Sequence, residues 1–172
     1  MASAVDETAV KQAAQKDGLA AGDAALLLAE MKASRIAARH ADALVIGCDQ
    51  LLVCNGVWYD KPQSLEQAAS QLRALRNQTH TLETAVVCLR NGVEIWHHLA
   101  RPRLTMRDFS EAFLQAYLLR EGDAVLSSVG AYRLEGMGVH LFDRIEGEHS
   151  AILGLPLLPL LGFLRQHGAL LG

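Results

Sequence analysis

A chain of 172 residues with 51% hydrophobic residues can bury one sizeable core and is short for two independent domains, so we expect a single domain over residues 1–172. The formal charge of -3 at pH 7 argues against DNA or RNA as a partner, because phosphate backbones are held by clustered Lys and Arg. The most apolar segment is interrupted by Pro156 and Pro159, so no membrane span is expected. The three cysteines form no CxxC pattern, which argues against a disulfide framework or structural zinc and favours a reducing, cytoplasmic location.

The first third of the chain predicts a helix, a buried strand and a hairpin. Apolar residues recur at helical spacing from about Asp23 to His40, and Asp23 is the expected N-cap. Residues 43–53 are almost continuously apolar, which is typical of a strand buried on both faces. Asn55 and Gly56 then predict a two-residue turn into a short antiparallel strand at 57–59.

The middle of the chain predicts a second helix and three strands. Ser64 with Gln67 three residues later is a capping box, so a helix is expected from there to about Arg76. Three strands follow at residues 81–89, 93–99 and 103–107. The first two are joined by Asn91 and Gly92, which predicts a β-meander.

The last third predicts two helices and one strand. Ser110 is expected to cap a helix that runs to Arg120, with Gly122 as its stop. A strand is expected at 139–145 and a closing helix at 157–167. The chain therefore reads as an α/β domain with a continuous mixed sheet.

Asp49 is the strongest candidate for chemistry, because a carboxylate inside so apolar a strand needs a cation, a metal or a function. The alternative is an aspartate that caps the end of the strand. Lys61 follows the hairpin and could approach the same site, although a lone lysine before a proline is usually a solvated loop residue. Lys32 and Arg35 lie one helical turn apart, and Asp6 and Glu7 could supply oxygen ligands for a divalent cation.

Several segments, in order, resemble the motifs of the Maf family of nucleotide pyrophosphatases. They are VDET at 5–8, KAS at 32–34, VIGCDQ at 45–50, DKP at 60–62, SSVGAYRLEGMG at 127–138, LFDRIEG at 141–147 and LGLPL at 153–157. A single motif such as DKP is weak evidence, but this ordered series over most of the chain is highly specific.

The resemblance implies a Maf/ITPase-like fold, with an elongated mixed sheet and two lobes around a central cleft. It also implies hydrolysis of nucleoside triphosphates to a monophosphate and pyrophosphate with a divalent metal, Mg²⁺ or Mn²⁺, often by a homodimer. By motif, Asp49 resembles the catalytic acid-base of the family and one of its metal ligands. Glu7 resembles another metal ligand, and Lys32 and Lys61 resemble phosphate contacts.

Two positions indicate a subgroup. Gln50 stands where many members have Thr, and Glu135 stands where many have Gln, as in the 7-methyl-GTP pyrophosphatases. Both are expected to contact the substrate, Glu135 by accepting hydrogen bonds from the guanine N1 and N2 edge.

The front of the chain departs from the family pattern. A strand and a loop of the form LASxSxxR usually precede the acidic motif, and only residues 1–5 do so here. Such a loop would present Ser and Arg to the triphosphate, and Arg can bind a phosphate group through two parallel hydrogen bonds. Two alternatives follow: a catalytically impaired module that binds a nucleotide or a partner, for example in cell-division control, or a misassigned start codon.

Overall fold

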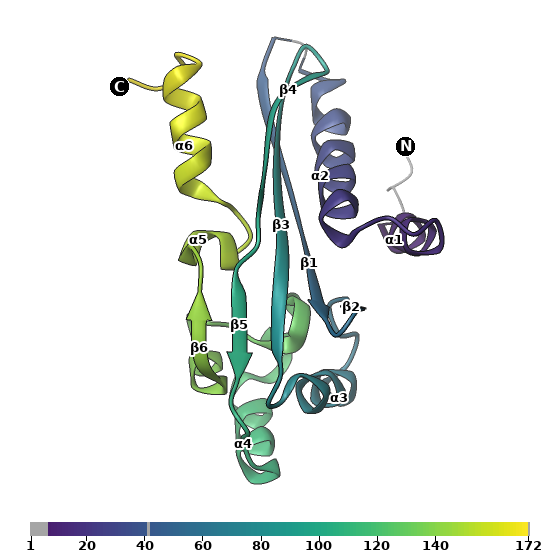
Figure 1. Cartoon of the computed structure of the whole chain (residues 1–172), viewed down its shortest axis with the longest axis vertical. Coiled ribbons are helices and arrows are strands. Elements are labelled where there is room, and N and C mark those ends of the chain that lie inside the picture. Colours follow the sequence, from purple (N-terminus) through teal and green to yellow (C-terminus); the bar gives the residue numbers. More distant parts are fainter. Residues whose placement is uncertain (1–6, 41, 172) are drawn as a thin grey trace. The chain divides into compact units, whose positions relative to one another are not determined.

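The computed structural model describes residues 7–40 and 42–171 (Figure 1). The chain divides into two compact units. Unit 1 comprises residues 1–50, 83–101 and 148–172, and unit 2 comprises residues 51–82 and 102–147. The α/β class is confirmed.

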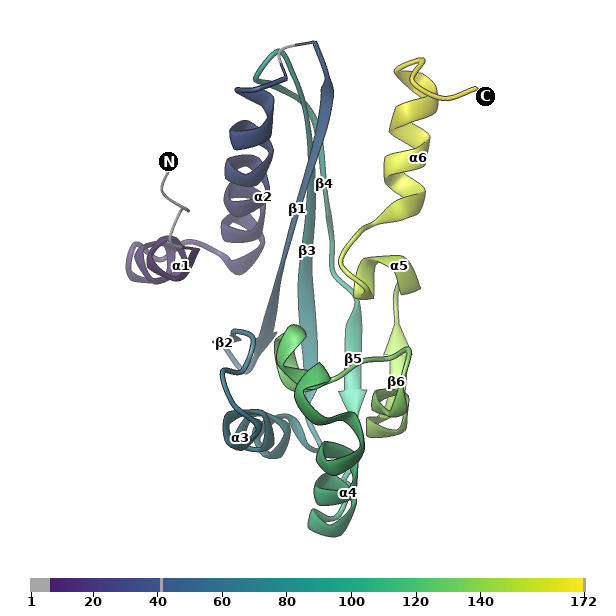
Figure 2. The same cartoon turned by 180° about the vertical axis from the view of Figure 1, so that it is seen from behind.

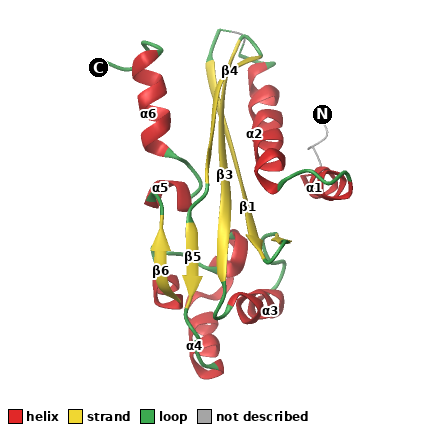
Figure 3. Cartoon of the chain, in the orientation of Figure 1, coloured by secondary structure: helices red, strands yellow, loops and turns green. Residues whose placement is uncertain are grey.

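Six strands of the described residues form one sheet, in the order β2-β1-β3-β5-β6, with β4 also paired to β3 (Figure 3). Their bounds are β1 Leu44–Cys54, β2 Val57–Tyr59, β3 Thr79–Arg90, β4 Val93–Ala100, β5 Arg103–Met106 and β6 Phe142–Glu146. Every pair with a described register is antiparallel. Both hairpin turns expected at Asn-Gly pairs are confirmed, with Asn55 at φ 51° and Asn91 at φ 52°.

Unit 1 places helices on both faces of its strands. The helices are α1 Glu7–Lys16, α2 Ala21–Ala37, α5 His149–Ile152 and α6 Leu157–Gln166. In both views α2 and α6 lie on opposite sides of the strands (Figures 1 and 2). On the α6 side, Val86 and Cys88 of β3 form a buried cluster with Leu160. On that same side, Trp96 of β4 stacks on Phe163 with 4.8 Å between ring centroids.

The α2 face of β1 is shaped by a glycine. Side chains alternate along a strand, so Val45, Gly47 and Asp49 share one face. A Cβ atom at Gly47 would lie 2.2 Å from the carbonyl oxygen of Ala29 and 2.8 Å from the Cβ of Ala33. Helix α2 can therefore lie close to β1 only because position 47 has no side chain.

The helices of unit 2 are α3 Leu65–Leu75, α4 Glu111–Glu121 and the short 3-10 helices η1 Gly122–Ser127, η2 Val129–Ala131 and η3 Met137–Leu141. Both expected serine caps are confirmed: Ser64 Oγ accepts from the Gln67 amide at 3.1 Å, and Ser110 Oγ accepts from the Phe113 amide at 3.2 Å. Gly122 ends α4 at φ 55°, as expected.

The predicted β-meander is wrong. Strand β5 pairs with β3 rather than with β4, and it continues the register in which β4 pairs with β3. Thr84 of β3 faces Ala100 of β4, and Thr81 of β3 faces Arg103 of β5. The chain therefore continues along β3 without reversing, and Pro102, which lacks an amide proton, interrupts the strand there.

Three further expectations need correction. Strand β1 is not buried on both faces, because Ile46 and Cys48 are exposed. Asp23 lies in the first turn of α2, and the N-cap is Ala20, whose side chain makes no capping bond. The sequence pattern predicts neither α1 nor α5, and residues 139–141 are 3-10 helix rather than strand.

Gly47→Ala is expected to lower the free energy of unfolding by about 1–3 kcal/mol, because the new methyl group overpacks the contact with α2. Gly162→Ala is the matched control: its Cβ would meet nothing within 4 Å, and alanine in a helix is favourable by about 0.5–1 kcal/mol. Urea unfolding of both variants measures the difference. Equal stability of G47A and G162A would contradict the close packing of α2 on β1.

Candidate active site

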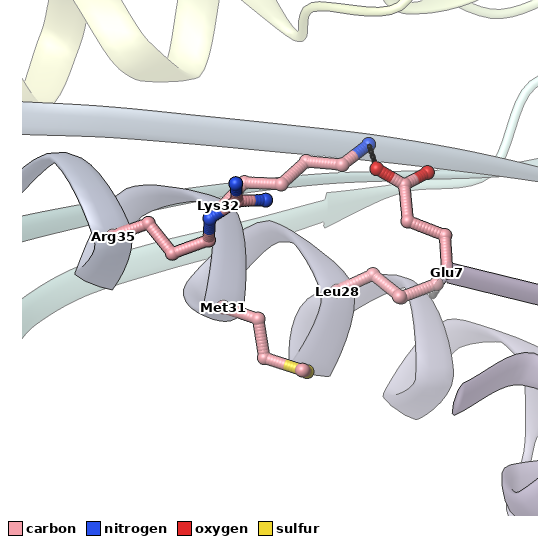
Figure 4. A pocket seen from close by; sticks show the side chains of 5 residues that line it. All are labelled: Glu7, Leu28, Met31, Lys32 and Arg35. Atoms are coloured by element: carbon pink, nitrogen blue, oxygen red, sulfur yellow. Dashed lines mark ion pairs between the residues drawn. The ribbon is translucent and has the colours of Figure 1, made fainter. Parts of the chain in front are cut away.

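Three charged side chains meet in unit 1, one each from α1, α2 and β1. Lys32 Nζ lies 2.5 Å from Asp49 Oδ1 and 3.3 Å from Glu7 Oε1. Figure 4 shows the Lys32 ammonium directed at Glu7, in a pocket also lined by Leu28, Met31 and Arg35. The structure thus brings together three of the predicted site residues, while Asp6 lies outside the described residues.

Asp49 is nearly buried, at 8% exposure. A buried carboxylate is costly unless it is paired, and Lys32 supplies the pair through Oδ1. The second oxygen, Oδ2, is buried and has no hydrogen-bond partner among the residues that the structure describes. One oxygen therefore anchors the carboxylate, and the other can accept a hydrogen bond or coordinate a cation.

The pKa values of the pair respond to burial and to each other. Burial raises the pKa of the Asp49 carboxyl, and the hydrogen bond and charge of Lys32 offset only part of that rise. Partial burial lowers the pKa of Lys32, but the hydrogen bond and charge of Asp49, with a smaller contribution from Glu7, raise it above its ordinary value. Asp49 is therefore a stronger base than an exposed aspartate.

The donors at this site suit a hard divalent cation. No group of three or more His, Cys, Asp or Glu side chains that could hold a metal occurs in residues 7–40 and 42–171. A magnesium ion usually keeps several waters and takes one or two carboxylates together with substrate phosphates. Two carboxylates, Glu7 and Asp49, fit that requirement. Both form ion pairs with Lys32, and Oδ2 of Asp49 has no partner among the described residues.

Gln50 is part of a hydrogen-bond network. Its amide nitrogen donates to Thr84 Oγ1 at 2.7 Å and approaches the carbonyl oxygens of Ala151 and Ile152 at 3.0 and 3.2 Å. The Thr84 hydroxyl in turn donates to the Ala151 carbonyl at 3.0 Å. The nitrogen of Gln50 is thus engaged with β3 and α5, so any contact with a substrate falls to its carbonyl oxygen.

Thr84 was not identified as a site residue from the sequence. Its side chain is fully buried and joins Gln50 to the end of α5. A hydroxyl within the apolar run of β3 was the available signal, since buried hydroxyls need a hydrogen-bond partner.

Lys61 and Glu135 belong to unit 2. Both are exposed; Lys61 precedes the buried Pro62, and Glu135 lies in the loop between η2 and η3. Their contacts with phosphate and with a nucleobase stay predictions, as does the central cleft.

Gln50→Ala is expected to lower the free energy of unfolding by about 1–3 kcal/mol, because it removes the donor to the buried Thr84 hydroxyl oxygen and to the carbonyl of the buried residue Ile152. Gln12→Ala, at an exposed position of α1, is the control and should change stability little. The two variants are compared by urea unfolding. A Q50A variant as stable as Q12A would show that the network contributes nothing to the fold.

Comparison with known proteins shows the family of the chain. A family model described as "Maf-like protein" matches residues 1–167. A protein of Granulibacter bethesdensis named "Nucleoside triphosphate pyrophosphatase" is 56% identical over 98% of this chain and 85% of its own length. One of the same name from Rhodospirillum rubrum is 54% identical over 99% and 84%. A Rhizobium meliloti protein named "7-methyl-GTP pyrophosphatase" is 44% identical over 98% and 85%. The chain belongs to the Maf family.

Proposed function

We propose that this chain hydrolyses nucleoside triphosphates to a nucleoside monophosphate and pyrophosphate, with Asp49 as the acid-base residue. The observation that carries the proposal is the grouping of Glu7, Lys32 and Asp49, with Asp49 nearly buried and one of its oxygens unpartnered. The names of the relatives support the same reaction.

The chemistry follows from the two oxygens of Asp49. Lys32 holds Oδ1, so Oδ2 accepts the proton of a water molecule as the water oxygen forms a bond to the α-phosphorus. The bond from that phosphorus to the bridging oxygen breaks, and pyrophosphate leaves with the electron pair. A raised pKa brings Asp49 closer to the operating pH, where a general base works best.

Two cations share the phosphate charge in this proposal. The Lys32 ammonium lies between the carboxylates and can also neutralise a phosphoryl oxygen, with Lys61 as a second phosphate contact. Glu7 and Asp49 would hold Mg²⁺ or Mn²⁺, which supplies further charge stabilisation on the phosphoryl oxygens when bound.

The base preference proposed is for guanine, with 7-methyl-GTP as one candidate substrate. Glu135 offers only acceptors, which match the N1 and N2 donors of guanine. Methylation at N7 gives the purine a positive charge, and a nearby carboxylate stabilises that charge electrostatically. Relatives at 44–46% identity named "7-methyl-GTP pyrophosphatase" support this choice.

We also propose a cytoplasmic homodimer. The free thiols of Cys48, Cys54 and Cys88 suit a reducing compartment. Three exposed leucines support self-association: Leu157 and Leu158 at the start of α6, and Leu153 directly after α5. The described residues contain no helix that is long and apolar enough to cross a membrane.

Asp49→Asn is expected to reduce kcat/KM by about 10²–10⁴-fold, because an amide cannot accept the proton of water. Asp143→Asn, at an exposed position of β6, is the control and should retain full activity. Pyrophosphate release from 7-methyl-GTP, GTP, dTTP and UTP with Mg²⁺ or Mn²⁺ measures the effect. Unchanged turnover in D49N would overturn the role of Asp49, and nucleotide binding without turnover by the unaltered chain would favour the impaired binding module.

Removal of divalent cations with EDTA is expected to abolish activity, and Mg²⁺ should restore it. Glu7→Gln is expected to raise the Mg²⁺ concentration for half-maximal activity by about tenfold, because it removes one of two carboxylates. Glu66→Gln, which changes an exposed carboxylate on α3, is the matched control. Equal Mg²⁺ requirements in E7Q and E66Q would remove Glu7 from the metal site.

A further inference from the structure

The loop that carries Glu135 in unit 2 follows an unusual backbone turn. Gly130 and Ala131 both have positive φ, at 75° and 59°. Such a conformation is strained for alanine and costs about 1–3 kcal/mol, so the surroundings must hold it in place. Ala131 is fully buried, whereas Glu135, four residues later, is exposed.

Two buried tyrosines fix the start of the loop. The Tyr117 hydroxyl donates to the Ala131 carbonyl at 3.1 Å. The Tyr132 hydroxyl lies 2.9 Å from His80 Nε2. Burial lowers the pKa of His80 to about 4, so the imidazole is neutral near pH 7 and this contact does not change there.

Glu121, the last residue of α4, reaches the loop on both sides of Glu135. Its Oε1 accepts a hydrogen bond from the Met137 amide at 2.8 Å, and its Oε2 lies 3.8 Å from Arg133 Nη1. The Glu121 side chain is only 9% exposed, so these contacts are shielded from solvent. One carboxylate therefore connects the residues two before and two after Glu135.

Two glycines allow the loop to close around this carboxylate. A Cβ at Gly136 would lie 2.6 Å from Glu121 Oε1, and a Cβ at Gly138 would lie 2.3 Å from the Arg133 carbonyl oxygen. Neither position has space for a side chain. The loop is thus shaped to Glu121, while the side chain of Glu135 faces solvent.

We propose that Glu121 is a positioning residue for base recognition: by holding Arg133 and Met137, it sets the direction in which the Glu135 carboxylate meets the nucleobase. This inference rests on the proposed function, in which Glu135 accepts from the guanine edge. A rigid acceptor discriminates between bases better than a mobile one, because no ordering entropy is lost on binding.

The test compares kcat and KM for 7-methyl-GTP and UTP in Glu121→Ala, Glu121→Gln and Glu135→Ala. Glu66→Ala is the control, since it removes an exposed carboxylate. In E121A the KM for 7-methyl-GTP should rise about tenfold, with kcat little changed, and the preference for 7-methyl-GTP over UTP should fall about tenfold. E121Q keeps an acceptor for the Met137 amide and loses the ion pair with Arg133, so it should fall between E121A and the unaltered chain.

Hydrogen exchange at the Met137 amide supplies a readout independent of turnover. Exchange should be about tenfold faster in E121A and unchanged in E66A. Unchanged hydrogen exchange in E121A would overturn the inference. It would also be overturned if E135A lost the base preference while E121A kept it. A base preference unaffected by E135A would instead contradict the proposed role of Glu135, while faster exchange in E121A would still support the hold of Glu121 on the loop.

Discussion

The ion pair between Lys32 and the nearly buried Asp49 is the interaction on which the candidate site depends. An unpaired carboxylate at this depth would be expelled or protonated, and Lys32 satisfies only one of its oxygens. Burial and pairing act on the pKa in opposite directions, and burial is the larger effect. Asp49 is thereby kept in place as a strengthened base with one oxygen available.

This pair depends in turn on how closely α2 approaches β1. Gly47 lies two residues before Asp49 on the same face of the strand, directly against Ala29 and Ala33. Lys32 adjoins Ala33, so the close contact at Gly47 sets the distance over which its side chain has to reach. The small residues beside the site therefore have a functional consequence although they carry no chemistry.

Local signals predicted most of the elements, because their causes lie within a few residues. The turns at Asn55 and Asn91 and the caps at Ser64 and Ser110 are examples. The pairing of β5 with β3 depends on contacts distant in sequence, and spacing alone suggested a meander. Asp49 was recognisable as a carboxylate in an apolar strand. Two sets of contacts were not recognisable: the hydrogen bond of Gln50 to Thr84, and the contacts of Glu121 with Arg133 and Met137. Each joins residues 12 or more apart by tertiary packing.

The most direct test of this account is the pKa of Asp49 itself, measured by ¹³C NMR titration of its carboxyl carbon in the unaltered chain and in Lys32→Met. We expect a pKa above the ordinary aspartate value in the unaltered chain, because burial outweighs pairing. In K32M the pKa of Asp49 should be higher still, because both the hydrogen bond and the charge that lower it are removed. An Asp49 pKa at or below the ordinary value, or one that K32M leaves unchanged, would contradict the account.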